Sequence, residues 1–368
     1  MNSAPPDREY TPCQDHIPGL DGLRGIAALL VLWDHLPETL GGPLHNKIKA
    51  LVWPGFMGVD IFFVLSGFLI TRILLTDRQK GRPLKNFLIR RFLRIFPIYY
   101  LTILVLLFAA PGIYLLWCAF YLSNIYFSYH PVVLPLHHTW SLSVEEHFYL
   151  IWPLFAHFLS VSRSRRVALF GLIPLAFVSA IVILVFQDKV PAHGLIYTGT
   201  LCRASSLALG ASFAYSEAWL RRDIRHLGRV IAVLGAIAVI SLPFHLVLPG
   251  EWKSLARMTF FSSFSGITVL SVIGLSDARV RAARVLSSGV LPYCGRISYG
   301  IYLYHYPIYT AFHLISDNSD EVPTTVLPCV LAVVATMGTA IASYHLIERP
   351  ILRFKDRFRG AAPLAGRA

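Results

Sequence analysis

The chain has 368 residues, of which 55% are hydrophobic and only 14% are charged, against roughly 25% charged residues in a typical soluble domain. This composition excludes a disordered chain, a small disulfide-stapled scaffold and an ordinary soluble enzyme, and it favours a polytopic membrane protein. The 33 Lys and Arg residues exceed the 20 Asp and Glu residues and give a net charge of +13. In a membrane protein such an excess gathers in cytoplasmic loops, so we expect no nucleic-acid partner.

Ten apolar stretches follow one another along the chain, each near the length of about 20 residues that a membrane-spanning helix needs. We therefore expect an all-α integral membrane protein with ten transmembrane helices. The third stretch contains Pro111 and Gly112, which suit either one kinked helix or two short ones. The stretches are Leu20–Leu40, Val52–Leu75, Pro97–Leu122, Trp140–Ser160, Val167–Phe186, Gly194–Tyr215, Val230–Val247, Met258–Leu275, Ile297–Ile315 and Thr324–Ile347.

The connecting segments alternate in charge, and this alternation sets the expected orientation. Every second connection is rich in Arg and Lys, whereas those between carry few, and residues 317–321 are acidic. The alternation is unbroken only if the third stretch is one helix, and it then places both termini in the cytoplasm. We expect a multi-pass protein of the inner (plasma) membrane with polar cytoplasmic tails at residues 1–17 and 354–368. The first tail has no apolar signal-peptide core, so the first span is expected to serve as the insertion signal.

Two ionisable residues of the first stretch share one helix face. Arg24 and His35 are 11 residues apart, which is about 20° beyond three full turns and places His35 roughly 16 Å further along the axis. An Arg near the cytoplasmic mouth could meet an anion, and a His at mid-depth could move a proton near neutral pH. The structural alternative is a buried His hydrogen-bonded across the bundle, with an Arg that snorkels to the headgroups.

Three carboxylates also lie inside apolar stretches, where an ionised group needs a partner. Asp60 could orient a His or pair with an Arg. Glu145 and Glu146 lie about 8 Å inside the fourth stretch and point about 100° apart, so we expect different roles for them. Desolvation suits such carboxylates to general acid or base work, whereas the structural alternative is an ion pair with Arg24 or Arg203.

Aromatic and imidazole side chains gather in the ninth stretch. Tyr299, Tyr302 and His305 recur every three residues and drift slowly around one face, which favours a polar cavity lined by their tips. An interfacial aromatic belt is the alternative, and it accounts well for Tyr304 and Tyr306. The five cysteines include no CxxC pair, and we expect neither a metal site nor a disulfide framework.

These residues belong to motifs that follow one another in a fixed order. The motifs are LDGLRGIAALLVLWDH, GVDIFFVLSGFLI, RRFLRIFPIYY, WSLSVEEHFYLIWP, Arg203 with Gly210, ISYGIYLYH and IERPI. In their order and spacing the chain resembles the acyltransferase 3 family of membrane proteins, which O-acylate cell-envelope sugars and some secondary metabolites. The resemblance predicts one such transmembrane domain over residues 18–353. Some members carry a further esterase-like domain, and we expect the stand-alone form. His147 and Tyr304 depart from the residues usual in the family, and either difference could alter the acceptor pocket without touching the chemistry.

The resemblance implies an O-acyltransferase with acyl-CoA, expected to be acetyl-CoA, as a cytoplasmic co-substrate and with no permanently bound cofactor. The acyl group would pass to a hydroxyl of a carbohydrate or glycosylated acceptor at the membrane or beyond it. His35 is the expected general base, and a buried donor such as Arg24 or Tyr302 would stabilise charge on the thioester oxygen. The other expected site residues are Glu145, Glu146 and Asp60 at the catalytic centre, Arg90, Arg91 and Arg94 for the CoA phosphates, and Trp140, Tyr149, Arg203, Ser298, Tyr302 and His305 around the cavity.

The three donor-binding arginines lie in residues 85–96, which we expect to form a short basic amphipathic helix on the cytoplasmic face. Membrane lipid is a further expected contact of the chain. Buried His, Glu, Asp and Arg would also suit a transporter or a proton-coupled sugar carrier. Such a carrier would show repeat symmetry or paired broken helices, and the sequence indicates neither. We therefore favour acyl transfer, with the acceptor and the acyl chain length left open.

Overall fold

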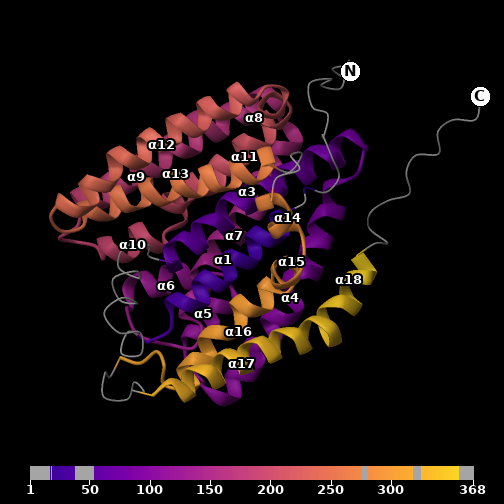
Figure 1. Ribbon diagram of the computed structural model, residues 1–368. Helices are drawn as coiled ribbons and strands as arrows, with labels where there is room; N and C mark the ends of the chain where they lie inside the picture. Colours follow the sequence, from indigo (N-terminus) through magenta and orange to yellow (C-terminus); the bar gives the residue numbers. More distant parts are fainter. Residues whose placement is uncertain (1–16, 18, 38–53, 276–280, 318–324, 356–368) are drawn as a thin grey trace, which may run out of the picture.

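The computed structural model describes residues 17, 19–37, 54–275, 281–317 and 325–355. Throughout these residues the regular structure is helical and contains no strand (Figure 1), as expected for a chain whose backbone groups must be paired inside lipid. The predicted tails at 1–17 and 354–368 lie outside the described residues, apart from residues 17, 354 and 355. The elements are α1 Leu20–Asp34, α3 Pro54–Gln79, α4 Leu84–Ala109, α5 Tyr114–Ala119, α6 Ser123–Tyr129, η2 His137–Thr139, α7 Trp140–Phe158, α8 Val161–Arg166, η3 Val167–Leu172, α9 Ile173–Val185, α10 Ala192–Thr198, α11 Thr200–Arg222, α12 Ile224–Val247, α13 Trp252–Leu275, α14 Arg281–Ser287, α15 Val290–Arg296, α16 Ser298–Ala311, α17 Val326–Ser343, η5 Tyr344–Glu348 and α18 Arg349–Lys355.

Six helical segments in the described part of the chain are long and apolar enough to cross a membrane. The other expected spans coincide with α1, α7, α11 and α16, of which α1 has 15 residues and α16 has 14, fewer than the about 20 that a full crossing needs. The all-helical membrane architecture is confirmed, whereas the count of ten and the orientation stay predictions. The six segments are Gly55–Gln79, Leu84–Ala109, Val161–Val185, Ile224–Phe244, Trp252–Leu275 and Val326–Phe354.

Two predicted helix boundaries are wrong, and proline explains both. The first helix was expected to reach Leu40 but ends at Asp34, because Pro37 disfavours helical geometry in the residue before it. The third was expected over Pro97–Leu122 after a separate amphipathic helix. A single helix instead runs from Leu84 to Ala109 and ends before the Pro-Gly pair. The basic stretch 85–96 therefore forms the first turns of α4 and is no separate helix.

The central helix of the bundle is α3, and its candidate span is 78% buried. It packs against α1, α7, α11 and α13, and Figure 1 shows α9, α12 and α13 on one flank with α17 and α18 on the other. Glycines bring α3 and α11 together. A Cβ atom on Gly67 would lie 1.9 Å from the Leu207 carbonyl oxygen, and one on Gly210 would lie 1.9 Å from that of Val64. Only glycine permits this close approach, so these glycines have a packing role.

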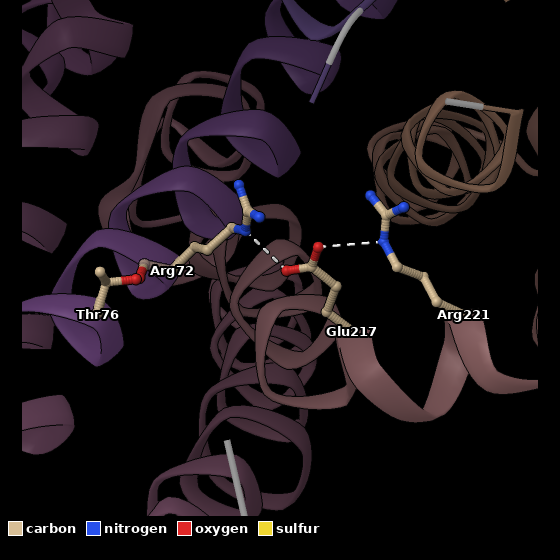
Figure 2. A network of polar contacts seen from close by, with 4 residues as sticks. All are labelled: Arg72, Thr76, Glu217 and Arg221. Atoms are coloured by element: carbon tan, nitrogen blue, oxygen red, sulfur yellow. Dashed lines mark hydrogen bonds and ion pairs between the residues drawn. The ribbon is translucent and has the colours of Figure 1, made fainter. Parts of the chain in front are cut away.

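One end of the bundle, which we call the basic end, is held together by arginines. Arg72 Nε on α3 donates to Glu217 Oε2 on α11 at 2.8 Å, and Arg221 Nε donates to Glu217 Oε1 at 3.2 Å (Figure 2). Arg78 at the end of α3 donates to the carbonyl of Leu159, just after α7. These contacts tie the C-terminal parts of α3, α7 and α11 to one another.

The opposite end, which we call the outer end, is joined by acidic side chains. The Val133 amide donates to Asp317 Oδ2 at 3.0 Å, and His193 Nδ1 lies 3.0 Å from Glu251 Oε2. Segments expected on one side of the membrane thus meet at one end of the bundle. Because α3 is long enough to run from the outer end to the basic end, side chains along it reach sites at both ends.

Candidate active site

A cavity at the basic end, which we call the inner cavity, is enclosed by α1, α3, α4, α7 and α16. Its volume is about 130 Å³. The wall combines a mainly aliphatic and aromatic surface with three arginines and two glutamates. The lining residues are Arg24, Val59, Phe62, Phe63, Leu65, Ser66, Leu69, Ile70, Ile73, Arg91, Arg94, Ile95, Ser141, Leu142, Glu145, Glu146, Tyr149, Ser298, Tyr299 and Tyr302.

Glu145 is held on three sides within the inner cavity. Ser66 Oγ donates to Glu145 Oε1 at 2.8 Å, and the Tyr149 hydroxyl donates to Glu145 Oε2 at 2.7 Å. Arg91 Nη2 lies 3.7 Å from the same Oε2 atom, and its guanidinium covers the Tyr149 ring at 3.8 Å. The structural alternative named Arg24 or Arg203 as the ion-pair partner, and that pairing is wrong, because Arg91 on α4 reaches the carboxylate.

Glu146 also lines the inner cavity, and it is 8% exposed. No hydrogen bond or ion pair joins its carboxylate to another described side chain. The neighbouring glutamates therefore differ as the helix geometry predicts: Glu145 is fixed in a network, and Glu146 presents a carboxylate to the cavity.

The three predicted donor-binding arginines do not form one cluster. Arg91 and Arg94 line the inner cavity together with Arg24. Arg90 instead forms a buried ion pair with Asp77 of α3, which also accepts from Arg82 at 3.1 Å. Burying an arginine requires a partner charge, and Asp77 supplies it. The prediction that Arg90 joins Arg91 and Arg94 in one cytoplasmic cluster is therefore wrong, and Arg24 takes the third position at the cavity.

A second cavity lies nearer the outer end, and we call it the outer cavity. Its volume is about 190 Å³. Aromatic rings and imidazoles dominate its wall, and Arg and Lys are absent from the described residues that line it. Those residues are Val31, Asp34, His35, Gly55, Val59, His137, His138, Trp140, Tyr197, Tyr302 and Tyr306.

His35 lies in the outer cavity at the C-terminal end of α1. Its Nδ1 is 2.8 Å from the Val31 carbonyl oxygen, and a carbonyl only accepts, so Nδ1 carries a proton. In the neutral form of the ring, Nε2 is then the acceptor. The ring lies 5.0 Å from the His305 ring and 5.2 Å from the Tyr306 ring, centroid to centroid. Arg24 opens into the inner cavity, so the two residues of the first motif serve different cavities.

Val59 and Tyr302 line both cavities and form the wall between them, which we call the partition. The Tyr302 hydroxyl donates to the His138 carbonyl at 3.0 Å and lies 2.6 Å from Ser141 Oγ. The Phe62 ring meets the Tyr302 ring edge-on at 6.1 Å. Two hydrogen bonds and an aromatic contact thus hold the Tyr302 ring in place between the cavities.

Asp60 and Arg203 pair with each other and line neither cavity. Arg203 Nη2 donates to Asp60 Oδ2 at 2.8 Å, and both side chains are almost fully buried. Ser206 Oγ donates to the other carboxylate oxygen, and the guanidinium lies 5.8 Å from the Trp140 ring. The structure therefore brings this pair behind Trp140, a residue of the outer cavity, and does not bring Asp60 to His35.

The remaining predicted residues divide between the two cavities. Tyr149 and Ser298 line the inner cavity, and Arg24 Nη2 donates to Ser298 Oγ at 3.4 Å. Trp140 lines the outer cavity. His305 is fully buried, its Nδ1 lies 2.6 Å from the Tyr302 carbonyl oxygen, and its ring packs against those of His35 and His138. His305 therefore supports the outer cavity from behind.

Sequence reasoning missed several residues of the outer cavity. His138 packs 4.9 Å from the His305 ring and stacks on Tyr306 at 5.1 Å. Tyr306 is 5% exposed, so its assignment to an aromatic belt is wrong. Burial lowers the pKa of the His137 imidazole, which keeps that ring neutral near pH 7. His137 and His138 stand next to each other just before the apolar stretch that begins at Trp140, and this pair was the sequence signal that could have identified them.

Three histidines meet at the outer cavity, yet the described residues contain no group of three or more His, Cys, Asp or Glu side chains placed to hold a metal ion. An imidazole whose Nδ1 is committed to a carbonyl is instead suited to accept a proton at Nε2. The arrangement can therefore perform acid–base chemistry at the outer cavity and bind an anion at the inner one.

Residues 17–345 match a protein family described as an acyltransferase domain. The peptidoglycan O-acetyltransferase OatA of Listeria monocytogenes is 32% identical over 371 residues, covering 94% of this chain and 57% of that protein. The O-acetyltransferase OatA of Staphylococcus aureus is 29% identical over 376 residues, covering 94% of this chain and 58% of that protein. The chain thus spans somewhat more than half the length of these relatives. No solved structure matches it significantly.

Proposed function

The chain belongs to the acyltransferase domain family, and from this premise we propose that it is a multi-pass membrane O-acetyltransferase. The proposed reaction moves an acetyl group from acetyl-CoA to a hydroxyl of a carbohydrate or glycosylated acceptor. Support comes from the two relatives, both named O-acetyltransferases and one of them a peptidoglycan O-acetyltransferase. We propose the plasma membrane as its location, with the basic end in the cytoplasm.

The inner cavity is the proposed donor site. Coenzyme A is a polyanion with a long, thin arm, and a guanidinium binds phosphate through paired hydrogen bonds. Arg24, Arg91 and Arg94 converge on a cavity whose other walls are mainly apolar. The phosphates would lie at the arginines, and the arm would carry the thioester inward along the aliphatic wall to the partition.

The outer cavity is the proposed site of the acceptor hydroxyl. Trp140, Tyr197 and Tyr306 offer rings against which a sugar can pack, and Asp34 offers a carboxylate for its hydroxyls. Because His35 Nδ1 donates to the Val31 carbonyl, Nε2 is the nitrogen that would accept the hydroxyl proton. A neutral imidazole is suited to accept a hydroxyl proton near pH 7.

Acyl transfer follows from bringing these two sites together at the partition. The acceptor oxygen attacks the thioester carbonyl carbon while His35 takes the hydroxyl proton. The C–S bond then breaks, and the proton passes from His35 to the departing sulfur, which leaves an ester and free coenzyme A. The Tyr302 hydroxyl is committed to the His138 carbonyl and Ser141, so we assign it to holding the partition and not to the thioester oxygen. Arg24, roughly 16 Å from His35 along α1, is left to bind the donor.

The observation that carries this proposal is the pair of cavities that share the partition, one lined by cations and the other by His35. The test uses the purified full chain in lipid vesicles with acetyl-CoA labelled in the acetyl group. Ester-linked label on added N-acetylglucosamine or muramic acid oligosaccharides, detected by mass spectrometry, is the expected result. Movement of an unmodified sugar across the vesicle, with no ester formed, would instead establish the carrier function.

A further inference from the structure

A surface hollow at the outer end lies outside the proposed reaction centre. Its volume is about 370 Å³. Most of the side chains that line it offer hydrogen-bonding groups. The lining residues are Val133, Pro135, Thr310, His313, Ile315, Ser316 and Asp317.

The hollow adjoins the outer cavity on two sides. On one side, Asp317 accepts from the Val133 amide at 3.0 Å, and the carbonyl of the preceding Val132 lies 3.0 Å from Nδ1 of His137, a residue of the outer cavity. On the other side, Thr310 Oγ1 donates to the carbonyl of Tyr306 at 2.9 Å. His137 and Tyr306 line the outer cavity, while Val133, which follows Val132, and Thr310, one turn beyond Tyr306, line the hollow.

The chemistry of the hollow suits a neutral, hydroxyl-rich molecule. The Thr310 hydroxyl, which donates to carbonyls of its own helix, can accept from a sugar hydroxyl, and so can the Asp317 carboxylate. The Ser316 hydroxyl and the His313 imidazole add polar surface to the hollow. The carboxylate of Asp317 would repel a phosphate or a uronate, and the described lining contains no Arg or Lys to attract one. His313 adopts a φ of +56° as the left-handed residue that ends α16, where the Leu314 amide donates to the Tyr309 carbonyl.

We propose that this hollow is a second sugar subsite, which holds the unit next to the one that is acylated. The acceptor is then a glycan of at least two linked sugar units, one in the outer cavity and one in the hollow. This inference rests on the proposed O-acetyltransferase function and narrows its acceptor class. The hollow adds binding surface without adding any group to the chemistry at His35.

The test compares acceptors of different length with the full chain in lipid vesicles. β-1,4-linked oligomers of N-acetylglucosamine and of glucose, from one to four units, are assayed with saturating acetyl-CoA. We expect kcat/KM to rise roughly tenfold between one and two units in at least one series, as two or more added hydrogen bonds would produce. The Thr310→Val and Asp317→Asn double variant should lose most of that gain and keep the wild-type kcat/KM for the single sugar.

The control is His130→Ala, because His130 is exposed at the same end and packs on Tyr126 outside the hollow. It should keep the full gain with length. Equal kcat/KM for one and two units in both series would overturn the subsite, and so would a double variant that loses activity on every acceptor equally. Transfer to single sugars without a length effect would leave the acetyltransferase standing and remove only the subsite. If the wild type acylates no acceptor, both the proposed acetyltransferase function and the proposed subsite are wrong.

Discussion

The inner and outer cavities share two wall residues, Val59 and Tyr302, yet they differ sharply in charge. The inner cavity sets three arginines against two glutamates in an aliphatic wall. The outer cavity has Asp34 as its one charged side chain among the described lining residues and is otherwise built from rings and small groups. The first suits a polyanion with an apolar arm, and the second suits a neutral hydroxyl compound that needs a base. The difference supports a division into donor and acceptor sites.

The largest expected effect comes from removing the base of the outer cavity. His35→Ala should lower the rate of acyl transfer by roughly 10²–10⁴, the usual contribution of a general base. Acetyl-CoA binding should be unchanged, because the arginines that hold the donor line the other cavity. Turnover and equilibrium donor binding, measured on the same purified preparation, separate the two effects.

The matched control for that variant is His157→Ala, a histidine in the last turn of α7 at the basic end. It should leave turnover within about twofold of wild type, as expected of a surface change away from a site. A near-normal rate in His35→Ala, together with an inactive Glu146→Gln enzyme, would move the base to the inner cavity. The division of labour between the cavities would then be wrong.

The next effect separates two arginines on the same helix, one turn apart. Arg94→Ala should weaken acetyl-CoA binding about 10- to 100-fold, the value of one or two charge-assisted hydrogen bonds. Arg90→Ala should leave donor affinity unchanged and lower stability by about 3 kcal/mol, since it removes a partner from the buried Asp77 carboxylate. Acetyl-CoA titration and thermal unfolding distinguish the outcomes. Equal loss of affinity in both variants would restore the single cluster that the sequence predicted.

The contrast between Arg90 and Arg94 shows which features of the site cannot be predicted from the sequence alone. Composition and apolar stretches predicted an all-helical membrane fold, because burial of backbone groups in lipid leaves few alternatives. Helix periodicity also placed Arg24 and His35 on one face. It could not assign Arg90, because the choice depends on Asp77, a side chain contributed by another helix. Helix periodicity predicts which face of its helix a residue occupies, whereas tertiary packing determines which side chain of another helix it contacts.

The outer cavity shows the same limit over a longer separation. His138 and His305 are 167 residues apart and meet with ring centroids 4.9 Å apart. Only the packing of α16 beside η2 brings them together. The sequence placed Tyr302 at a polar cavity and assigned Tyr306 to an interfacial belt. It could not show that Tyr306 also lines a cavity, because that depends on the packing of α16 against the segment that carries His137 and His138.

The smallest expected effect tests the partition between the cavities. Tyr302→Phe keeps the ring and removes the hydroxyl contacts with Ser141 and the His138 carbonyl, each worth about 1 kcal/mol. A looser partition should admit water from the outer cavity to the thioester, so acetyl-CoA hydrolysis without acceptor should rise roughly fivefold, as a change of about 1 kcal/mol implies. Thiol release gives the rate. Tyr309→Phe, which alters a buried tyrosine two turns along the same helix, should leave hydrolysis at its basal value. Unchanged hydrolysis in Tyr302→Phe would mean that Tyr302 does not separate the two cavities.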